Sequence, residues 1–360
     1  MMSEKASLAT RVWRWQGQET SFAATARGIS GDASDDHALR PGTAAELTEA
    51  DLALIRHLQR DGRITFVELA QALNIAEKTV RKRVAELRDK GLIEITAVTD
   101  PRLFGYASVA MVGLRLEPGR IRSAVARELF QVPSIDYVVA TKGRYDLLIE
   151  ALCTDDAELS RVIDIELRGR PGVIDAEVFS YLHLHYQQPS WDAAQEKSTG
   201  KASAPRTFDI DAVDMHIVRH LSEDGRAKFL EIARQLDVSE GQIRQRFARL
   251  TESGALRVVA IVNPRSLGYG TTAWLCISVA PGHAVGAVAD RLAGLPSVAY
   301  LSVCAGRFDI LAEVVCRDKD DLFQLLDRDV RPSSDIARLE SLLCDDLFYR
   351  RVMPAPDSKA

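Results

Sequence analysis

The side chains best suited to chemistry lie on one expected helix, from Glu77 to about Lys90, and they suit nucleic-acid binding rather than bond making. Val80, Val84 and Leu87 have the i, i+4, i+7 spacing of a helix face that packs on a core. At about 100° per residue, the remaining faces carry polar and mostly cationic residues, namely Lys78, Thr79, Arg81, Lys82 and Arg83. Donors opposite the core suit base edges, and flanking arginines suit phosphates.

The same helix returns later in the chain with a less charged surface. The sequence repeats at a constant offset of 163 residues, so that Asp51 corresponds to Asp214. The second helix keeps an apolar stripe and both flanking arginines, Arg244 and Arg246, but presents Gln242 and Gln245 outward. A glutamine can bind adenine with two hydrogen bonds, whereas a lysine favours guanine or phosphate. We expect the two helices to contact different half-sites.

The repeat extends over most of the chain. Asp61-Gly62-Arg63 returns as Asp224-Gly225-Arg226, and Gly143-Arg144-Tyr145-Asp146 returns as Gly306-Arg307-Phe308-Asp309. The repeated unit is much longer than the roughly 20–50 residues of a solenoid repeat. The chain is therefore expected to be a covalent pseudo-dimer of a two-domain unit.

Each unit is expected to have a helical part and a sheet part. In the first unit, Thr48 caps a helix that ends at Asp61-Gly62, Thr65 begins a short helix, and the cationic helix follows. A short helix, a tight break and a helix with a charged face form a helix-turn-helix pattern. The sheet part has a β-α-β-β-α-β order, with strands at 107–116, 136–141, 145–153 and 173–186. Such a sheet has one open face, which we expect the sister copy to cover.

The expected domain boundaries follow from these patterns. We expect a disordered tail at 1–45, helix-turn-helix domains at 46–104 and 208–267, sheet domains at 105–186 and 268–351, a linker at 187–207 and a tail at 352–360.

Composition limits the function classes. The chain has 360 residues, 46% of them hydrophobic, a net charge of −5 and a pI near 5.9, so any nucleic-acid binding must come from local patches. No apolar run approaches the roughly 20 residues of a membrane span. Five cysteines without a CxxC pair indicate reduced thiols in a cytosolic protein.

Other constellations carry weaker signals. His183 and His185 alternate on one strand, and His216 and His220 are spaced i, i+4, but packing or surface roles explain these pairs better than a metal does. Four cysteines of the second sheet domain, at 276, 304, 316 and 344, lack zinc-ribbon spacing. No P-loop, dinucleotide-binding glycine motif or nucleophile elbow occurs. We expect no metal, no cofactor and no catalytic residue.

The chain resembles the leucine-responsive/asparagine-regulator (Lrp/AsnC) family of transcription regulators. The resemblance rests on Asp61-Gly62-Arg63, on the run from Val80 to Val84 closing with Leu87 and Gly91-Leu92-Ile93, on Pro101–Tyr106, and on Gly143–Asp146. Both copies carry this set, which covers nearly all of 47–186 and 210–349. It implies an α+β fold, with two tandem copies of a winged helix-turn-helix domain followed by a ferredoxin-like βαββαβ domain.

The resemblance also implies partners. These are double-stranded DNA, a small effector such as an amino acid, and further copies of the chain through face-to-face pairing of sheet domains, in the cytoplasm at the nucleoid and without a membrane. By position, the effector contacts would be Gly143, Tyr145, Asp146, Gly306, Phe308 and Asp309. The alternative is a plain β-hairpin turn that needs glycine and whose aspartate bonds its own backbone. A tandem fusion departs from the family pattern, so one chain would equal a family dimer.

Four other interpretations remain. The cationic helix face could simply be solvated, or the helical unit could be a dimerisation module. The chain could be an amino-acid sensor that does not bind DNA. It could also be an enzyme, because it resembles two-copy siroheme decarboxylases of this fold, although the His-Asn-Tyr-type and Tyr-Asn-x-Trp signatures of that group are absent at 136–139 and 145–148.

Overall fold

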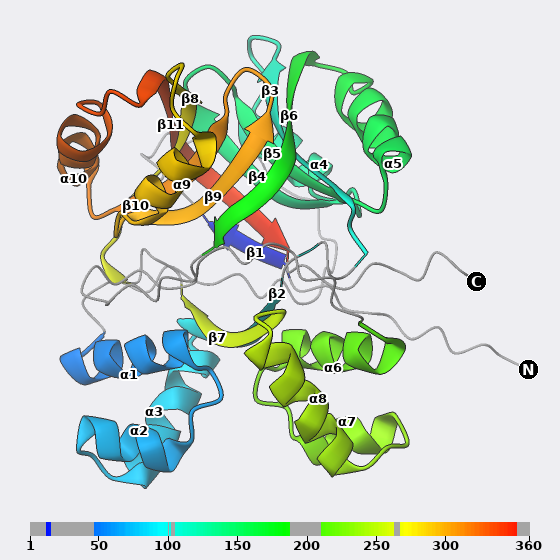
Figure 1. Cartoon of the computed structure of the whole chain (residues 1–360), viewed down its shortest axis with the longest axis vertical. Helices are drawn as coiled ribbons and strands as arrows, with labels where there is room; N and C mark the ends of the chain where they lie inside the picture. The colour runs from blue at the N-terminus through cyan, green and yellow to red at the C-terminus, as the bar shows by residue number, and fades with distance from the viewer. Residues whose placement is uncertain are drawn as a thin grey trace, which may run out of the picture.

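A computed structural model describes residues 12–15, 47–99, 101, 105–187, 210–262 and 267–350, which form a helical lobe below a sheet lobe (Figure 1). Most of the expected tail and linker lies outside these residues. The helical lobe contains α1 (Glu49–Arg60), α2 (Phe66–Leu73) and α3 (Glu77–Asp89) from the first copy, and α6 (Ala212–Glu223), α7 (Phe229–Gln235) and α8 (Glu240–Glu252) from the second.

Helix boundaries follow the caps expected from the sequence. The hydroxyl of Thr48 accepts a hydrogen bond from the Asp51 amide (3.2 Å), and the Asp51 carboxylate accepts one from the Thr48 amide (2.9 Å). Thr65 caps α2 in the same way, and Ser239 caps α8. Ala76 precedes α3 without any side-chain cap, because alanine has no acceptor.

The two helical units are joined by strands that the sequence analysis did not predict. β2 (Ile93–Thr99) follows α3, β7 (Leu256–Val262) follows α8, and the two pair antiparallel over their whole length. α1 packs against β7 and α6 packs against β2. Buried side chains from both units, such as Leu58, Ile95, Leu221 and Val258, therefore belong to one continuous hydrophobic core.

The sheet lobe is built from two equivalent four-stranded halves. The first contains β3 (Ser108–Leu116), β4 (Ile135–Lys142), β5 (Leu147–Cys153) and β6 (Val173–Gln187), and the second contains β8 (Thr271–Val279), β9 (Val298–Ala305), β10 (Ile310–Cys316) and β11 (Ile336–Arg350). Their orders, β4-β5-β3-β6 and β9-β10-β8-β11, match each other. Four helices pack on the outside, α4 (Arg122–Leu129), α5 (Asp156–Arg161), α9 (Val285–Ala293) and α10 (Lys319–Gln324) (Figure 1). α5 and α10 continue as π-helical turns at Val162–Arg168 and Leu325–Val330.

The halves meet at their edges as well as their faces, which differs from the expected face-to-face packing. β6 pairs with β9, and β11 pairs with β4, so the eight strands close into a barrel. Closure pairs edge strands that would otherwise expose unpaired backbone groups. The open faces meet inside, where Phe179 and Phe308 lie with ring centroids 5.9 Å apart.

Two further features complete the fold. Val12–Trp15 form a short strand, β1, along β11, at a place where the sequence analysis expected a disordered tail. Among the described residues, no helix has the length and apolarity needed to cross a membrane.

Candidate nucleic-acid interface and effector turns

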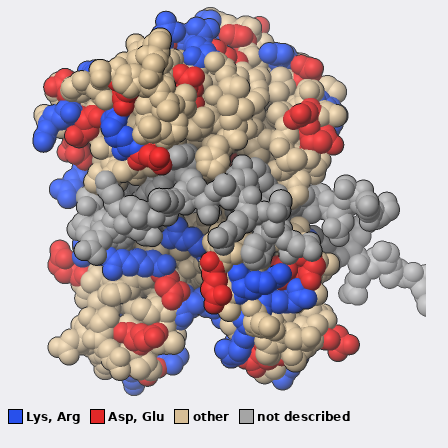
Figure 2. All heavy atoms as spheres, viewed as in Figure 1, with Lys and Arg blue, Asp and Glu red and all other residues tan. Residues whose placement is uncertain are grey.

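The expected DNA-contacting side chains lie on α3 and α8 and are mostly exposed. Lys78, Thr79, Lys82, Gln242 and Gln245 all face solvent, and the side chain of Lys82 is 77% exposed. Figure 2 shows lysine and arginine atoms interspersed with acidic atoms over the helical lobe, in keeping with the acidic net charge. Positive charge is therefore available locally on these helices rather than as a broad basic surface.

One flanking arginine is held in the same way in both units. The Nε atom of Arg81 donates to Glu77 Oε1 (2.9 Å), and its guanidinium lies 4.7 Å from the centroid of the Phe66 ring. Arg244 repeats the arrangement with Glu240 (3.1 Å) and Phe229 (5.4 Å). Both arginines stay largely exposed, so they can contact phosphates without losing their position.

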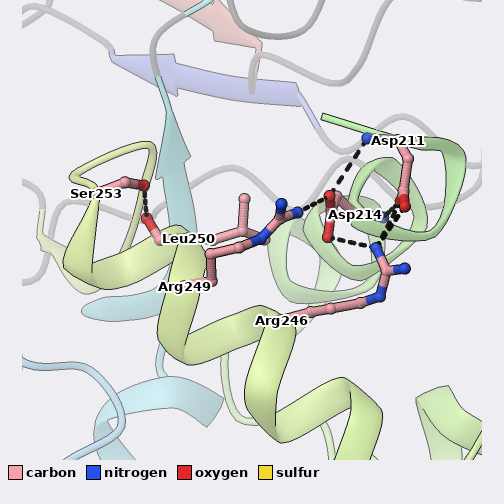
Figure 3. A network of polar contacts seen from close by, with 6 residues as sticks. All are labelled: Asp211, Asp214, Arg246, Arg249, Leu250 and Ser253. Carbon is pink, nitrogen blue, oxygen red and sulfur yellow. Dashed lines mark hydrogen bonds and ion pairs between the residues drawn. The ribbon is translucent and has the colours of Figure 1, made fainter. Parts of the chain in front are cut away.

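The other flanking arginine differs between the units. In the second unit, Arg246 Nη1 lies 2.6 Å from Asp211 Oδ2 and 3.1 Å from Asp214 Oδ1, and Arg249 also bonds Asp214 (Figure 3). Hydrogen bonding to Arg246 lowers the pKa of Asp211, and the same bond raises the pKa of Arg246. Asp214 is fully buried.

The first unit holds its equivalent arginine more loosely. Arg83 Nε lies 3.6 Å from the buried Asp51, and Glu86 stands at the position of Arg249. Glu86 instead attracts Lys82 (3.6 Å) and Arg83 (3.3 Å). The flanking arginine of α3 is therefore more available to an external anion than that of α8.

Gln242 has a second role that the sequence analysis missed. Its side-chain oxygen accepts a hydrogen bond from the Ser239 amide (3.0 Å), which closes the capping box of α8. Base contact by Gln242 would have to use its amide nitrogen or break this bond. The assignment of base contacts to Lys78, Thr79, Lys82, Gln242 and Gln245 remains a prediction.

The Asp-Gly-Arg motif is structural, and sequence reasoning did not assign it a task. Arg63 donates to the carbonyls of Gly225 (2.6 Å) and Ala227 (3.1 Å) in the other copy. Arg226 donates to the carbonyls of Gly62 (2.9 Å) and Ile64 (2.5 Å). The sequence did hold a signal for this contact, namely the recurrence of Asp-Gly-Arg at the constant offset, because a motif kept in both copies can form a symmetric contact.

The expected effector turns lie where the two halves of the barrel meet. A Cβ on Gly143 would lie 2.5 Å from Leu342 Cδ2, and one on Gly306 would lie 3.1 Å from the Val178 carbonyl oxygen. Both glycines have positive φ angles, 151° and 153°, which favour glycine. Each turn therefore packs closely on the last strand of the other copy.

The remaining residues of these turns have structural partners. Tyr145 and Phe308 are buried in the barrel interior. Asp146 Oδ2 accepts from the Leu116 amide (2.9 Å), and Asp309 Oδ2 accepts from the Val279 amide (2.8 Å). The aspartates therefore bond the ends of neighbouring strands, β3 and β8, and not the backbone of their own turns as the plain hairpin interpretation expected. Effector contact at these six residues remains a prediction.

Charged pairs surround the turns and join the copies. Arg144 Nε lies 2.6 Å from Glu340 Oε2, and Arg307 Nε lies 2.6 Å from Glu177 Oε1. Glu177 also accepts a hydrogen bond from the Tyr145 hydroxyl (2.6 Å). Hydrogen bonding to Arg144 lowers the pKa of Glu340.

Carboxyl groups and tyrosines form a polar cluster inside the barrel. Glu150 accepts hydrogen bonds from the hydroxyls of Tyr181 and Tyr300, both at 2.7 Å. Glu313 accepts one from Tyr137 (3.1 Å), whose oxygen accepts from Trp274 Nε1 (2.8 Å). Burial raises the pKa of Glu150 and raises that of Glu313 to about 7.

The histidines and cysteines do not form a metal centre within the part of the chain that the structure describes. No group of three potential ligands gathers there, and the side chain of His185 lies outside the described set. Cys276, Cys304 and Cys316 are buried, and burial raises the pKa of the Cys304 thiol to about 12. Such thiols are protonated and unreactive near neutral pH.

Comparison with known proteins assigns both lobes. Residues 47–94 match a winged helix-turn-helix DNA-binding model, 210–251 match the AsnC-type helix-turn-helix domain, and 109–191 and 272–346 match the Lrp/AsnC ligand binding domain. An uncharacterized HTH-type transcriptional regulator of Pyrococcus abyssi is 37% identical over 133 residues, which are 37% of this chain and 84% of that protein. The HTH-type transcriptional regulator FL11 of Pyrococcus horikoshii is 31% identical over 140 residues, 39% of this chain and 91% of that protein.

A solved structure resembles nearly the whole chain. The siroheme decarboxylase NirDL aligns with a TM-score of 0.57 over 82% of this chain and 91% of its own, at 19% identity. At that identity the likeness concerns the fold alone.

Proposed function

The chain belongs to the Lrp/AsnC family, and we propose that it is a metabolite-responsive DNA-binding transcription regulator whose two copies form unequal halves of one DNA-binding unit. Homologues of one copy are HTH-type transcriptional regulators. The observation that carries the proposal is the joining of both helix-turn-helix units by β2 and β7 into one body with a shared core. A single chain thereby presents the two helices that a two-fold dimer would otherwise supply.

The two units differ in the chemistry that they offer DNA. Lys82 corresponds to Gln245, and Thr79 corresponds to Gln242. Lysine donors favour guanine and phosphate, whereas a glutamine amide can bind adenine. Arg81 and Arg244 suit phosphate contact in both units, Arg83 is available in the first, and Arg246 would have to leave Asp211 to join them. We infer an asymmetric operator with two different half-sites.

The effector is a small metabolite, and we propose an amino acid. The Gly-x-aromatic-Asp turns are the proposed contact region, because they lie at the junction between copies, where a bound molecule could bias how the halves associate. We also propose that chains associate with one another through the sheet lobe, and that the domain boundaries are those given in the sequence analysis. A protein with this task is expected in the cytoplasm, associated with the nucleoid.

The experiment that tests this proposal is selection of the full chain against random duplex DNA at moderate salt, with bound sequences determined. Two enriched half-sites of different sequence support the regulator with unequal halves. Two identical half-sites keep the regulator and contradict the division of base contacts. Binding without enrichment, lost uniformly as salt rises, contradicts both.

One alternative has a specific observation in its favour, namely the whole-chain likeness to NirDL. The strands at 136–139 and 145–148 read Asp-Tyr-Val-Val and Tyr-Asp-Leu-Leu, without the residues that the enzyme resemblance would require. Titration with an iron tetrapyrrole, followed by absorbance, distinguishes the two functions. A saturable spectral change would favour the enzyme.

A further inference from the structure

The two Asp-Gly-Arg loops bind each other through contacts that follow the pseudo-twofold symmetry between the copies. The carbonyl of Gly225 accepts from Arg63, and the carbonyl of Gly62 accepts from Arg226, so the contact is reciprocal. Each arginine also bonds a second carbonyl in the opposite loop. We call this set of contacts, made by Arg63 and Arg226 with the opposite loops, the arginine clasp.

The glycines of the motif allow the loops to approach the opposite strand closely. The Gly62 amide donates to the Val258 carbonyl (2.7 Å), and the Gly225 amide donates to the Ile95 carbonyl (2.8 Å). A Cβ on Gly62 would lie 3.0 Å from the Val258 carbonyl oxygen, and one on Gly225 would lie 2.9 Å from the Ile95 carbonyl oxygen. Any larger residue would push the loop away from the opposite copy.

The clasp connects one copy to the DNA-contacting helix of the other through an aromatic ring. The guanidinium of Arg226 lies 4.4 Å from the centroid of Phe66, and Arg81 on α3 lies 4.7 Å from the same ring. In the other direction, Phe229 has Arg63 at 4.2 Å and Arg244 of α8 at 5.4 Å. Each ring therefore has a cation from the opposite loop and a cation from its own DNA-contacting helix.

The clasp can fix the relative orientation of the loops that it joins. A guanidinium bonding two carbonyls has a fixed planar orientation, which an ammonium group does not have. Arg63 and Arg226 are partly buried, and burial lowers the pKa of Arg226 to about 10, which leaves it charged at neutral pH.

We propose that Arg63 and Arg226 are positioning residues that hold α3 and α8 in one relative placement and thereby set the half-site spacing that the chain accepts. This inference rests on the proposed DNA-binding function. It concerns the distance between half-sites and not the bases within them. If the proposal is right, a chain without the clasp accepts a wider range of half-site spacings, while each helix keeps its own sequence preference.

The test uses the full chain with both arginines changed to lysine, Arg63→Lys with Arg226→Lys, which keeps the charge and removes the two-carbonyl fork. Arg60→Lys is the matched control, because Arg60 is exposed at the end of α1. The DNA probes carry the two selected half-sites with zero to about five inserted base pairs, which turn one site through about half a helical turn. We expect wild type and the control to discriminate between best and worst spacing at least about tenfold more strongly than the double variant.

A measurement without DNA separates this inference from the proposed function. Spin labels at Asp89→Cys and Glu252→Cys, at equivalent ends of α3 and α8, report the distance between the helices. Cys344→Ser serves as background, since among the described cysteines Cys344 is the one that is not fully buried. We expect a narrow distance distribution in wild type and a broader one in the lysine variant. Absence of DNA enrichment by wild type overturns the proposed function, while the distances still decide whether the clasp positions the helices.

A second variant tests the inference if the first variant does not fold. Phe66→Leu with Phe229→Leu keeps both arginines and removes the rings that connect the loops to α3 and α8. It should relax the spacing preference in the same direction. Unchanged spacing preference in a folded variant, or an unchanged distance distribution, overturns the inference.

Discussion

The Nη1 atom of Arg246 lies 3.1 Å from the buried carboxylate of Asp214, so the flanking arginine of α8 is bound to α6 in the protein without DNA (Figure 3). The equivalent pair in the first unit, Arg83 and Asp51, is separated by 3.6 Å. A residue expected to contact phosphate in both halves therefore anchors its helix more firmly in one of them. We therefore expect Arg246 to contribute more to folding stability than Arg83, and Arg83 to be more available for phosphate binding.

Arg246→Ala should lower the free energy of unfolding more than Arg83→Ala. It removes a partner from a buried carboxylate, which typically costs about 1–3 kcal/mol, although Arg249 still compensates part of the charge of Asp214. Urea denaturation of the two variants measures the difference. Equal losses would show that the tighter ion pair adds nothing to stability.

Lys82→Ala should weaken discrimination between specific and scrambled DNA, while Arg83→Ala should weaken binding to both. Lys82 projects away from the core, where it can reach base edges, and Arg83 lies on the flank beside phosphates. Affinities of both variants for both DNAs, at several salt concentrations, test this division. The division of roles is refuted if each variant loses affinity for specific and for scrambled DNA by the same factor.

Exchanging one pair of equivalent residues should exchange half-site preference. Lys82→Gln with Gln245→Lys transfers the lysine from α3 to α8 and leaves net charge unchanged. We expect the selected operator to have the bases contacted by these residues exchanged between its halves. An operator identical to that of wild type would refute base contact by this pair.

Adding a cap to α3 and removing the cap of α8 should have opposite effects on stability. Ser239→Ala should destabilise the chain by about 1 kcal/mol, and Ala76→Ser should stabilise it by a similar amount. The reason is that Ser239 accepts from the Gln242 amide (3.2 Å), while α3 has no side-chain cap. Thermal unfolding of both variants provides the test. The cap explanation is wrong if Ala76→Ser lowers the midpoint.

Stability should fall as the pH rises from about 5 to 8, partly because of Glu313. Burial raises its folded pKa to about 7, so between the ordinary glutamate pKa near 4.3 and pH 7 the folded chain keeps a proton that the unfolded chain releases. The buried Glu150 acts in the same direction. Glu313→Gln removes this titration.

Thermal midpoints at pH 5 and pH 8 measure the effect of Glu313. The difference between the two midpoints should be smaller in Glu313→Gln than in wild type. Glu117→Gln, at an exposed position, is the control and should leave the difference unchanged. A difference in Glu313→Gln as large as in wild type would assign the pH dependence to other groups.

Local elements of the fold were predictable because short stretches of sequence specify them. Thr48 and Thr65 cap the helices that they were expected to begin, since a hydroxyl must meet an amide three residues ahead. The β-α-β-β-α-β order of the sheet lobe followed from residue alternation and helical spacing. The family was also recognisable, because its motifs are local.

By itself, the sequence determined the repeat, the helix-turn-helix pattern, the four strands of each sheet half, the exposed cations of α3 and the glutamines of α8. Only the tertiary structure decided that β2 pairs with β7, that β6 and β11 close a barrel with the other copy, and that Arg63 and Arg226 bond opposite loops. It also showed that Arg246 and Gln242 already have partners inside the protein. These contacts join residues more than a hundred positions apart or depend on side-chain geometry, and periodicity along the chain carries no information about which edges and loops meet.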